Sequence, residues 1–84
     1  MSEYELPLSE RLLITLHNLG ATSGDMAKRA DELAQFVQAD VNEINQLLDK
    51  LGSEGYASSY VNSGGNKKHY LTRTGIIRVC SLFS

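Results

Sequence analysis

The chain has 84 residues, of which 42% are hydrophobic and 21% are charged, with one proline, one cysteine and a formal net charge of −2. This length supports one domain with a thin core, and a single cysteine excludes an internal disulfide. No apolar run approaches the roughly 18 residues of a membrane span, and the acidic N-terminus is unlike a signal peptide, so we expect a cytoplasmic protein with no membrane partner.

Leucines at three- and four-residue intervals predict a first helix over residues 8–20. One face of it would carry Leu8, Leu12, Leu13, Leu16 and Leu19. Pro7 suits the first turn of a helix, and Gly20 suits the left-handed backbone that commonly ends one. Residues 1–7 are then an N-terminal extension.

A short second helix is expected over residues 28–38, and a longer third helix follows a tight turn, over residues 40–54. Asp31 is placed either to cap the second helix or to lie in its first turn. In the third, Asp40 and Glu43 have the spacing of a capping box, in which each side chain accepts from the other residue's backbone N–H. The apolar stripe behind it contains Val41, Ile44, Leu47, Leu48 and Leu51, and Gly55 ends the helix.

Two β-branched and aromatic runs predict an antiparallel hairpin over residues 56–72. Gly64 and Gly65, between the runs, would supply the positive φ that a hairpin loop requires. Thr72 can cap a last helix over residues 73–83. Apolar residues cover much of that helix, so it either closes the core or pairs with a second copy, and we expect the Cys80 thiol to be buried.

Charge is distributed unevenly along the chain. Residues 55–84 contain Lys67, Lys68, Arg73 and Arg78 and no acidic residue, whereas all ten acidic residues precede them. A basic segment on an acidic body can meet a polyanion on one face, with the acidic parts turned away.

The order of these elements resembles the winged helix-turn-helix family, and particular stretches carry the resemblance. ADELAQFVQADVNEINQLLDKLGSEGY is similar to a short helix with an "ELA" core that leads into a recognition helix. GGNKKHYLTRTG is similar to the wing and its return strand, ending in the YLTxxG pattern of regulators of the multiple-antibiotic-resistance and phenolic-acid-repressor types. With the first helix, the resemblance covers about residues 8–83. It implies an α+β, mainly helical fold with a three-helix core, a β-hairpin wing and a C-terminal helix.

The resemblance implies sequence-specific binding of double-stranded DNA, as a small transcriptional regulator, with the recognition helix in the major groove. Base reading is expected from Asn42, Asn45 and Gln46, whose amides can donate and accept in one plane. The alternative is an ordinary solvated helix face. Many recognition helices carry Arg or Lys at such positions, whereas Asp40, Glu43 and Asp49 repel phosphate.

Phosphate contacts are expected mainly from the wing. The candidates are Lys67, Lys68, Asn66, Lys28, Arg29, Lys50 and Arg73, with Ser63 and His69 as neutral helpers. Lysines also protect edge hairpins from aggregation, which is the alternative explanation for Lys67 and Lys68. Lys28 and Arg29 precede the second helix, whose free amides can hold a phosphate as well, or they lie in a solvated loop.

A single module neutralises few phosphates, so we expect a homodimer, with a monomer as the alternative. The surface would contain Ile76, Val79, Cys80 and Phe83, together with the N-terminal EYEL segment. His17 and His69 have no metal-ligand spacing, and no nucleophile has an obvious base, so we expect no metal, no cofactor, no small-molecule ligand and no enzyme activity. The alternative function is a protein-interaction module of a replication or transcription complex, which the acidic third helix favours.

Overall fold

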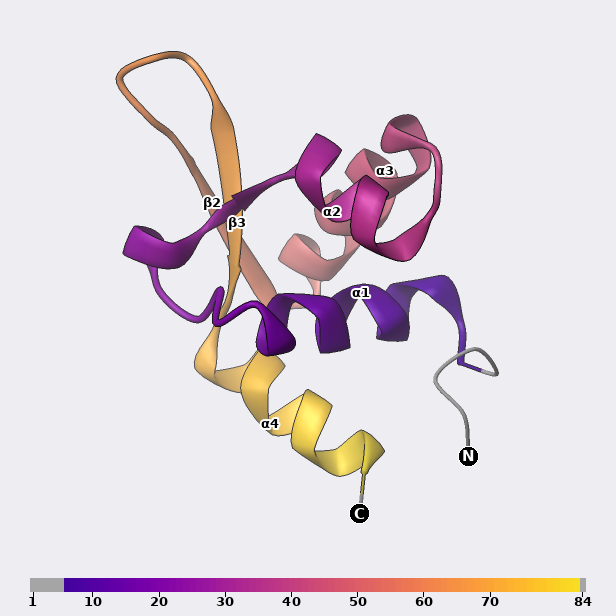
Figure 1. The fold of residues 1–84 in the computed structure, drawn as a ribbon. Coiled ribbons are helices and arrows are strands. Elements are labelled where there is room, and N and C mark those ends of the chain that lie inside the picture. The colour runs from indigo at the N-terminus through magenta and orange to yellow at the C-terminus, as the bar shows by residue number, and fades with distance from the viewer. Residues whose placement is uncertain (1–5, 84) are drawn as a thin grey trace.

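The computed structural model describes residues 6–83, which form four α-helices, one short 3-10 helix and three strands (Figure 1). In chain order these are α1 (Leu8–Asn18), η2 (Gly24–Met26), β1 (Lys28–Arg29), α2 (Ala30–Val37), α3 (Val41–Ser53), β2 (Ala57–Val61), β3 (Lys67–Leu71) and α4 (Arg73–Leu82). The predicted order of helices and hairpin is confirmed. Residues 1–5 of the predicted extension lie outside the described residues.

The helix ends follow local backbone chemistry. α1 begins directly after Pro7 and ends just before Gly20, whose φ of +72° is left-handed. Asp40 caps α3, but its Oδ1 accepts from the backbone N of Asn42 at 2.9 Å rather than from Glu43. Either of these early amides is free at a helix start, so the cap is confirmed and its predicted partner is wrong.

The second helix is shorter than predicted because Lys28 and Arg29 form a strand. β1 pairs antiparallel with β3, placing Lys28 opposite His69 and Arg29 opposite Lys68, and the sheet order is β1-β3-β2. Only then does α2 begin, and Glu32 Oε1 accepts from the backbone N of Arg29 at 3.1 Å. Two residues are too few to show a periodic pattern, so this strand could not be predicted from the sequence.

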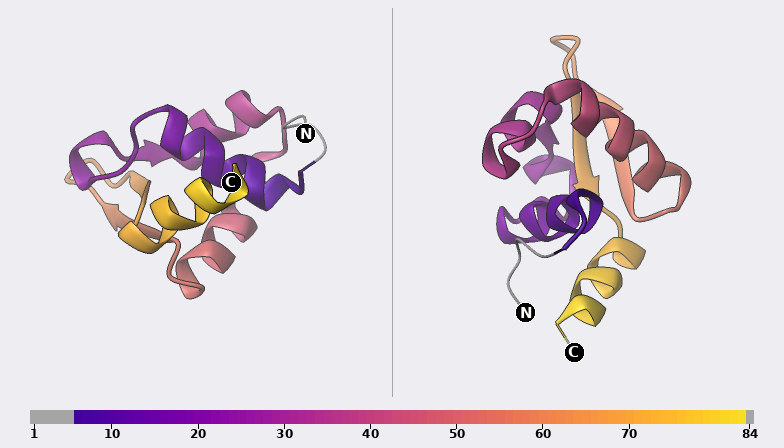
Figure 2. Two further views of the ribbon diagram at one scale, coloured as in Figure 1. Left: turned by 90° about the horizontal axis from the view of Figure 1, so that it is seen from below. Right: turned by 90° about the vertical axis from the view of Figure 1, so that its right-hand side faces the viewer.

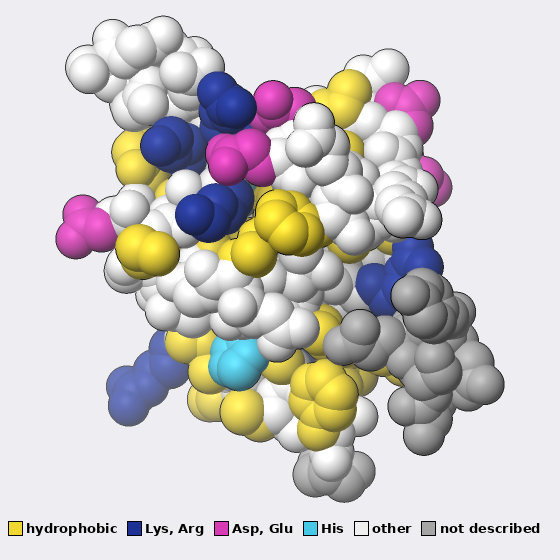
Figure 3. All heavy atoms as spheres, viewed as in Figure 1, with side chains coloured by type: hydrophobic (Ala, Val, Ile, Leu, Met, Phe, Trp, Pro, Cys, Tyr) yellow, Lys and Arg dark blue, Asp and Glu magenta, His cyan; other side chains and the backbone are white. Residues whose placement is uncertain are grey.

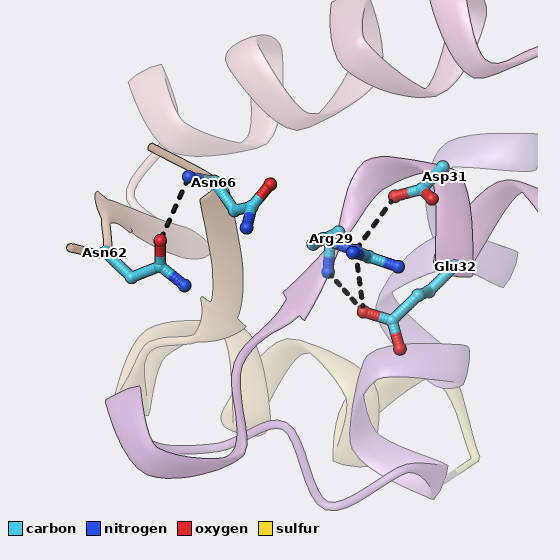
Figure 4. Close-up of polar contacts among 5 residues, drawn as sticks. All are labelled: Arg29, Asp31, Glu32, Asn62 and Asn66. Carbon is cyan, nitrogen blue, oxygen red and sulfur yellow. Dashed lines mark hydrogen bonds and ion pairs between the residues drawn. The ribbon is translucent and has the colours of Figure 1, made fainter. Parts of the chain in front are cut away.

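The hairpin loop is organised by an asparagine. Asn62 Oδ1 accepts from the backbone N of Gly64 at 2.9 Å and of Asn66 at 3.0 Å, and the second of these bonds is drawn in Figure 4. Only Gly65 has the positive φ expected of both glycines, at +80°. The Asn62 side chain therefore stabilises the turn at Gly64, where a positive φ was expected and is not found.

The core lies where the helices meet the sheet. α1 packs against α2 on one side and α4 on the other (Figure 1, Figure 2). The largest fully buried side chains are Leu12, Leu13, Leu16, Leu33, Ile44, Leu71 and Val79. An ion pair between Arg78 Nη2 and Glu10 Oε1, at 2.7 Å, also joins α4 to α1. No helix within residues 6–83 is long and apolar enough to span a bilayer.

Thr72 joins three segments of the chain. Its Oγ1 accepts from the backbone N of Gly75 at 3.1 Å, which confirms the predicted cap of α4, and donates to the carbonyl oxygen of Gly55. Its backbone N donates to the carbonyl oxygen of Tyr56 at 3.1 Å. The end of β3, the residues after α3 and the start of α4 are thus tied together at one residue.

The last helix closes the core, and two predictions about its side chains are wrong. Val79, predicted for a dimer surface, is 1% exposed and packs in the core, whereas the Cys80 thiol, expected to be buried, is exposed. Ile77 and Phe83 are 64% and 66% exposed. α4 therefore turns Gly75 and Val79 inward and leaves Ile77, Cys80 and Phe83 exposed among polar residues on its outer side.

Candidate nucleic-acid interface

The hairpin tip and the beginning of α3 lie at the same end of the molecule, opposite α4 (Figure 1, Figure 2). A contact between side chains also links the two elements: Lys67 Nζ of β3 lies 3.8 Å from Asp49 Oδ1, in the second half of α3. α3 and the hairpin therefore lie next to each other on one surface, so that a single large ligand could contact both.

The exposed side of α3 carries the three predicted base-reading residues. Ile44, Leu48 and Leu51 turn the other side into the core, and Asn42, Asn45 and Gln46 are all exposed. Helical periodicity adds Asp49 to the same side, since it follows Asn42 by seven residues and Gln46 by three. We call these four residues the outward face of α3; base reading by its amides stays a prediction.

The prediction that the acidic residues face away from the basic ones is wrong. Besides the contact between Lys67 and Asp49, Arg29 Nε lies 3.2 Å from Asp31 Oδ1 and 3.4 Å from Glu32 Oε1 (Figure 4). In Figure 3, Lys and Arg side chains lie beside Asp and Glu side chains beneath the hairpin tip. The fold brings the basic C-terminal segment against α3 at Lys67 and Asp49, and Arg29 is paired with its own sequence neighbours, so part of the positive charge is already neutralised.

Lys28 and Lys68 are not paired with a carboxylate in any ion pair among residues 6–83. Lys68 lies between Arg29 of β1 and Tyr60 of β2 in the sheet. Successive side chains of a strand point to opposite faces. Lys67 and Lys68 therefore point to opposite faces of the hairpin, Lys67 toward α3.

The remaining predicted phosphate ligands divide into two groups. Asn66 at the hairpin tip and Lys50 on α3 are both exposed. Arg73 begins α4 at the opposite end of β3 from the tip. It follows Lys67 by six residues, roughly 20 Å of extended chain, so the structure separates Arg73 from the other candidates.

His69 was expected to help at the surface, and that prediction is wrong, because the side chain is only 4% exposed. It borders a small pocket of about 100 Å³ between α3 and the hairpin, lined also by Leu48, Asp49, Gly52, Ala57, Ser58 and Ser59. No described residue hydrogen-bonds its Nε2. Burial lowers the pKa of His69, the Lys67 charge lowers it further, and the Asp49 charge acts in the opposite direction. The sequence analysis missed one signal: His69 lies two residues before Leu71, and residues two apart in a strand point to the same face, so His69 faces the core with Leu71.

The lowered pKa of His69 predicts that acid destabilises the protein. The unfolded histidine binds a proton near its ordinary pKa of 6.5, while the folded one resists it, so stability is full above that pH and is lost as the pH falls below it. We expect a lower urea midpoint at about pH 5.5 than at about pH 7.5. His69→Gln should flatten this dependence, and His17→Gln, an exposed control, should keep it. An unaltered pH dependence in His69→Gln would contradict the assignment.

Comparison with known proteins gives matches among solved structures only. No family model matches the chain, and no curated protein matches it. TubR from Bacillus megaterium pBM400 is 20% identical with a TM-score of 0.79, over 96% of this chain and 90% of TubR. MepR, a transcription regulator of the Staphylococcus aureus multidrug efflux pump MepA, is 18% identical with a TM-score of 0.77, over 95% of this chain and 57% of MepR. A candidate DNA-binding protein from Ralstonia eutropha JMP134 is 22% identical with a TM-score of 0.76, over 90% and 94%.

These similarities show the fold. The chain has the winged helix-turn-helix fold predicted from its sequence, with α2 and α3 as the helix pair and β2 and β3 as the wing. It spans little more than half the length of MepR. At 18 to 22% identity, its function has to be argued from its own surface.

Proposed function

We propose that this protein binds double-stranded DNA as a transcriptional regulator, with α3 in the major groove and the wing on the phosphate backbone. The observation that carries the proposal is the 3.8 Å contact between Lys67 and Asp49, which sets the wing beside the outward face of α3. The solved structures of similar fold include a complex of MepR with DNA and a MarR family transcriptional regulator from Silicibacter pomeroyi, which supports the proposal.

The amides of the outward face suit base reading. Asn42, Asn45 and Gln46 are exposed and near the start of α3, the part of a recognition helix that enters the major groove first. An Asn or Gln amide can make a bidentate contact with the N6 and N7 atoms of adenine. We therefore expect adenine at the bases that these residues face.

Phosphate contacts are assigned to the lysines near this surface. Lys67 and Lys68 point to opposite faces of the wing, which suits a hairpin that lies in a groove with a phosphate strand on each side. Lys28 and Lys50 extend the basic surface on β1 and α3, and Asn66 adds a neutral donor at the tip. Arg29 is left out because two carboxylates already hold it, and Arg73 because it lies at the far end of the wing.

Salt dependence tests the proposal directly. Each phosphate neutralised on duplex DNA lowers log affinity by about 0.9 per tenfold rise in salt. The four lysines predict a slope between roughly −3 and −4 for one copy of the chain. Gel shifts with a random duplex at several salt concentrations measure it. A duplex affinity that is absent, or that does not change with salt, would contradict the proposal.

The outer side of α4 is assigned to a second copy of the chain. Ile77 and Phe83 are exposed apolar residues there, with the exposed Cys80 between them, while Ile76 is partly buried against the core. One DNA-binding module of this size buries only about 600–1,000 Å², so two copies would strengthen binding to a two-fold symmetric site. Light scattering tests this, since a dimer would have twice the 9.3 kDa mass of the chain.

The carboxylates beside the wing favour a second candidate function. Asp31, Glu32 and Asp49 offset part of the positive charge, and a surface of mixed charge suits a protein partner more than a polyanion. In that case the chain would serve as a protein-interaction module, and the salt experiment would find no duplex binding.

A further inference from the structure

Asp49 is an exposed carboxylate in the middle of the surface proposed to meet DNA. It shares the outward face of α3 with Asn42 and Gln46, and its side chain is 74% exposed. Lys67 approaches one of its oxygens, Oδ1, at 3.8 Å. No hydrogen bond from any residue between 6 and 83 engages the carboxylate. Asp49 is thus free to accept hydrogen bonds from a ligand.

The stability of α3 does not explain an aspartate at this position. Aspartate is a poor residue for a helix interior. Asp49 also adjoins the last turn of α3, which ends at Ser53, where the helix dipole disfavours negative charge. An ion pair between two exposed side chains adds little stability. Asp40, by contrast, is explained by its cap.

We propose that Asp49 is a specificity-determining residue, which accepts a hydrogen bond from the N4 amino group of a cytosine in the major groove. The inference rests on the proposed function. A carboxylate only accepts, and the edges of guanine and thymine present only acceptors to it. Adenine offers its N6 donor beside the N7 acceptor, so cytosine is the base that best suits a carboxylate.

Lys67 reduces the repulsion between the Asp49 carboxylate and the phosphates of the DNA backbone. The Lys67 side chain is 52% exposed, and its Nζ is close enough to Asp49 to offset the negative charge, so the ammonium group could contact a phosphate at the same time. An isolated acid on the outward face would repel phosphates at every sequence alike. With Lys67 beside it, the charge penalty is reduced, and the hydrogen-bond preference remains as the discriminating effect.

Site selection from a randomised duplex library tests the inference. We expect wild-type protein to enrich sites with cytosine at one position, and Asp49→Ala to lose that preference, about 10-fold in relative affinity. Asp49→Asn keeps the side-chain shape but adds a donor, so it should change the preferred base at that position from cytosine to adenine. The other positions of the site should stay as they are.

Glu43→Gln is the matched control, because it removes the same charge from an exposed residue of the same helix. Glu43 lies about 120° around the helix axis from Asp49, away from the middle of the outward face. It should raise affinity for all sites without altering base preference. The inference is overturned if Asp49→Asn behaves in the same way, or if wild-type protein binds all duplexes alike. Absence of any duplex binding by wild-type protein would instead overturn the proposed function, and this inference with it.

Discussion

Replacing Gly75 with alanine is expected to destabilise the protein by about 3 kcal/mol, at the upper end of overpacking effects. Gly75 is buried in the first turn of α4, and a Cβ there would overlap the carbonyl oxygen of Tyr56 and lie 3.0 Å from Leu71 Cδ2. That carbonyl cannot move aside freely, because it accepts from the backbone N of Thr72 at 3.1 Å. Relief of the clash would therefore disturb both α4 and the root of the wing.

The control for this prediction is Gly52→Ala, in the last turn of α3. A Cβ at Gly52 meets nothing nearer than the Ala57 carbonyl oxygen, at 3.9 Å. Alanine is the better helix former, so this change should be neutral or stabilising, by up to about 1 kcal/mol. Urea unfolding of both variants measures the difference. A Gly75→Ala variant as stable as wild type would show that α4 does not pack against Tyr56 as closely as the structure has it.

Replacing Lys67 and Lys68 together with alanine is expected to weaken duplex binding by about 10- to 100-fold at low salt. The loss should be the same for every sequence, since phosphates carry no sequence information directly. The slope of log affinity against log salt should become shallower by about 1.8 for each copy of the chain. Loss of Lys67 also leaves Asp49 without its neighbour at 3.8 Å, so that carboxylate would repel phosphates more strongly.

Arg73→Ala is the control for the lysine pair. It removes a positive charge from the same third of the chain, at the opposite end of β3 from the wing tip, and should leave affinity and salt slope nearly unchanged. An equal loss in Arg73→Ala would mean that net charge alone governs binding. Wild-type affinity in the lysine double variant would rule out a phosphate role for the wing.

The helices were predictable from the sequence because their core contacts repeat with the helical period. Ile44, Leu48 and Leu51 form one stripe, which fixed both the existence of α3 and the exposed side that carries Asn42 and Gln46. β1 was not predictable, because two residues have no period and become a strand only when β3 offers them an open edge. Its backbone pairing with His69 and Lys68 is a long-range contact.

The predicted exposure of the α3 amides was right, whereas the predicted exposure of His69 and the predicted separation of acidic from basic residues were wrong. The α3 amides are exposed because they lie on the side of the helix opposite its buried apolar stripe. The contact between Asp49 and Lys67 depends instead on how the hairpin packs against α3. Those two residues are far apart in the chain, and nothing in the local sequence of either one specifies the other. His69 was misplaced because the polar run Lys67–His69 hid its alternation with the buried Leu71.

The junction at Thr72 couples the last helix mechanically to the hairpin. Its hydroxyl is hydrogen-bonded to Gly55 and Gly75, and its backbone N to Tyr56. A rotation of α4 would therefore also move the base of the hairpin. We therefore expect α4 and the hairpin to move together as one unit. In a symmetric pair held together through α4, the angle between the two subunits would dictate how far apart the two hairpin tips stand.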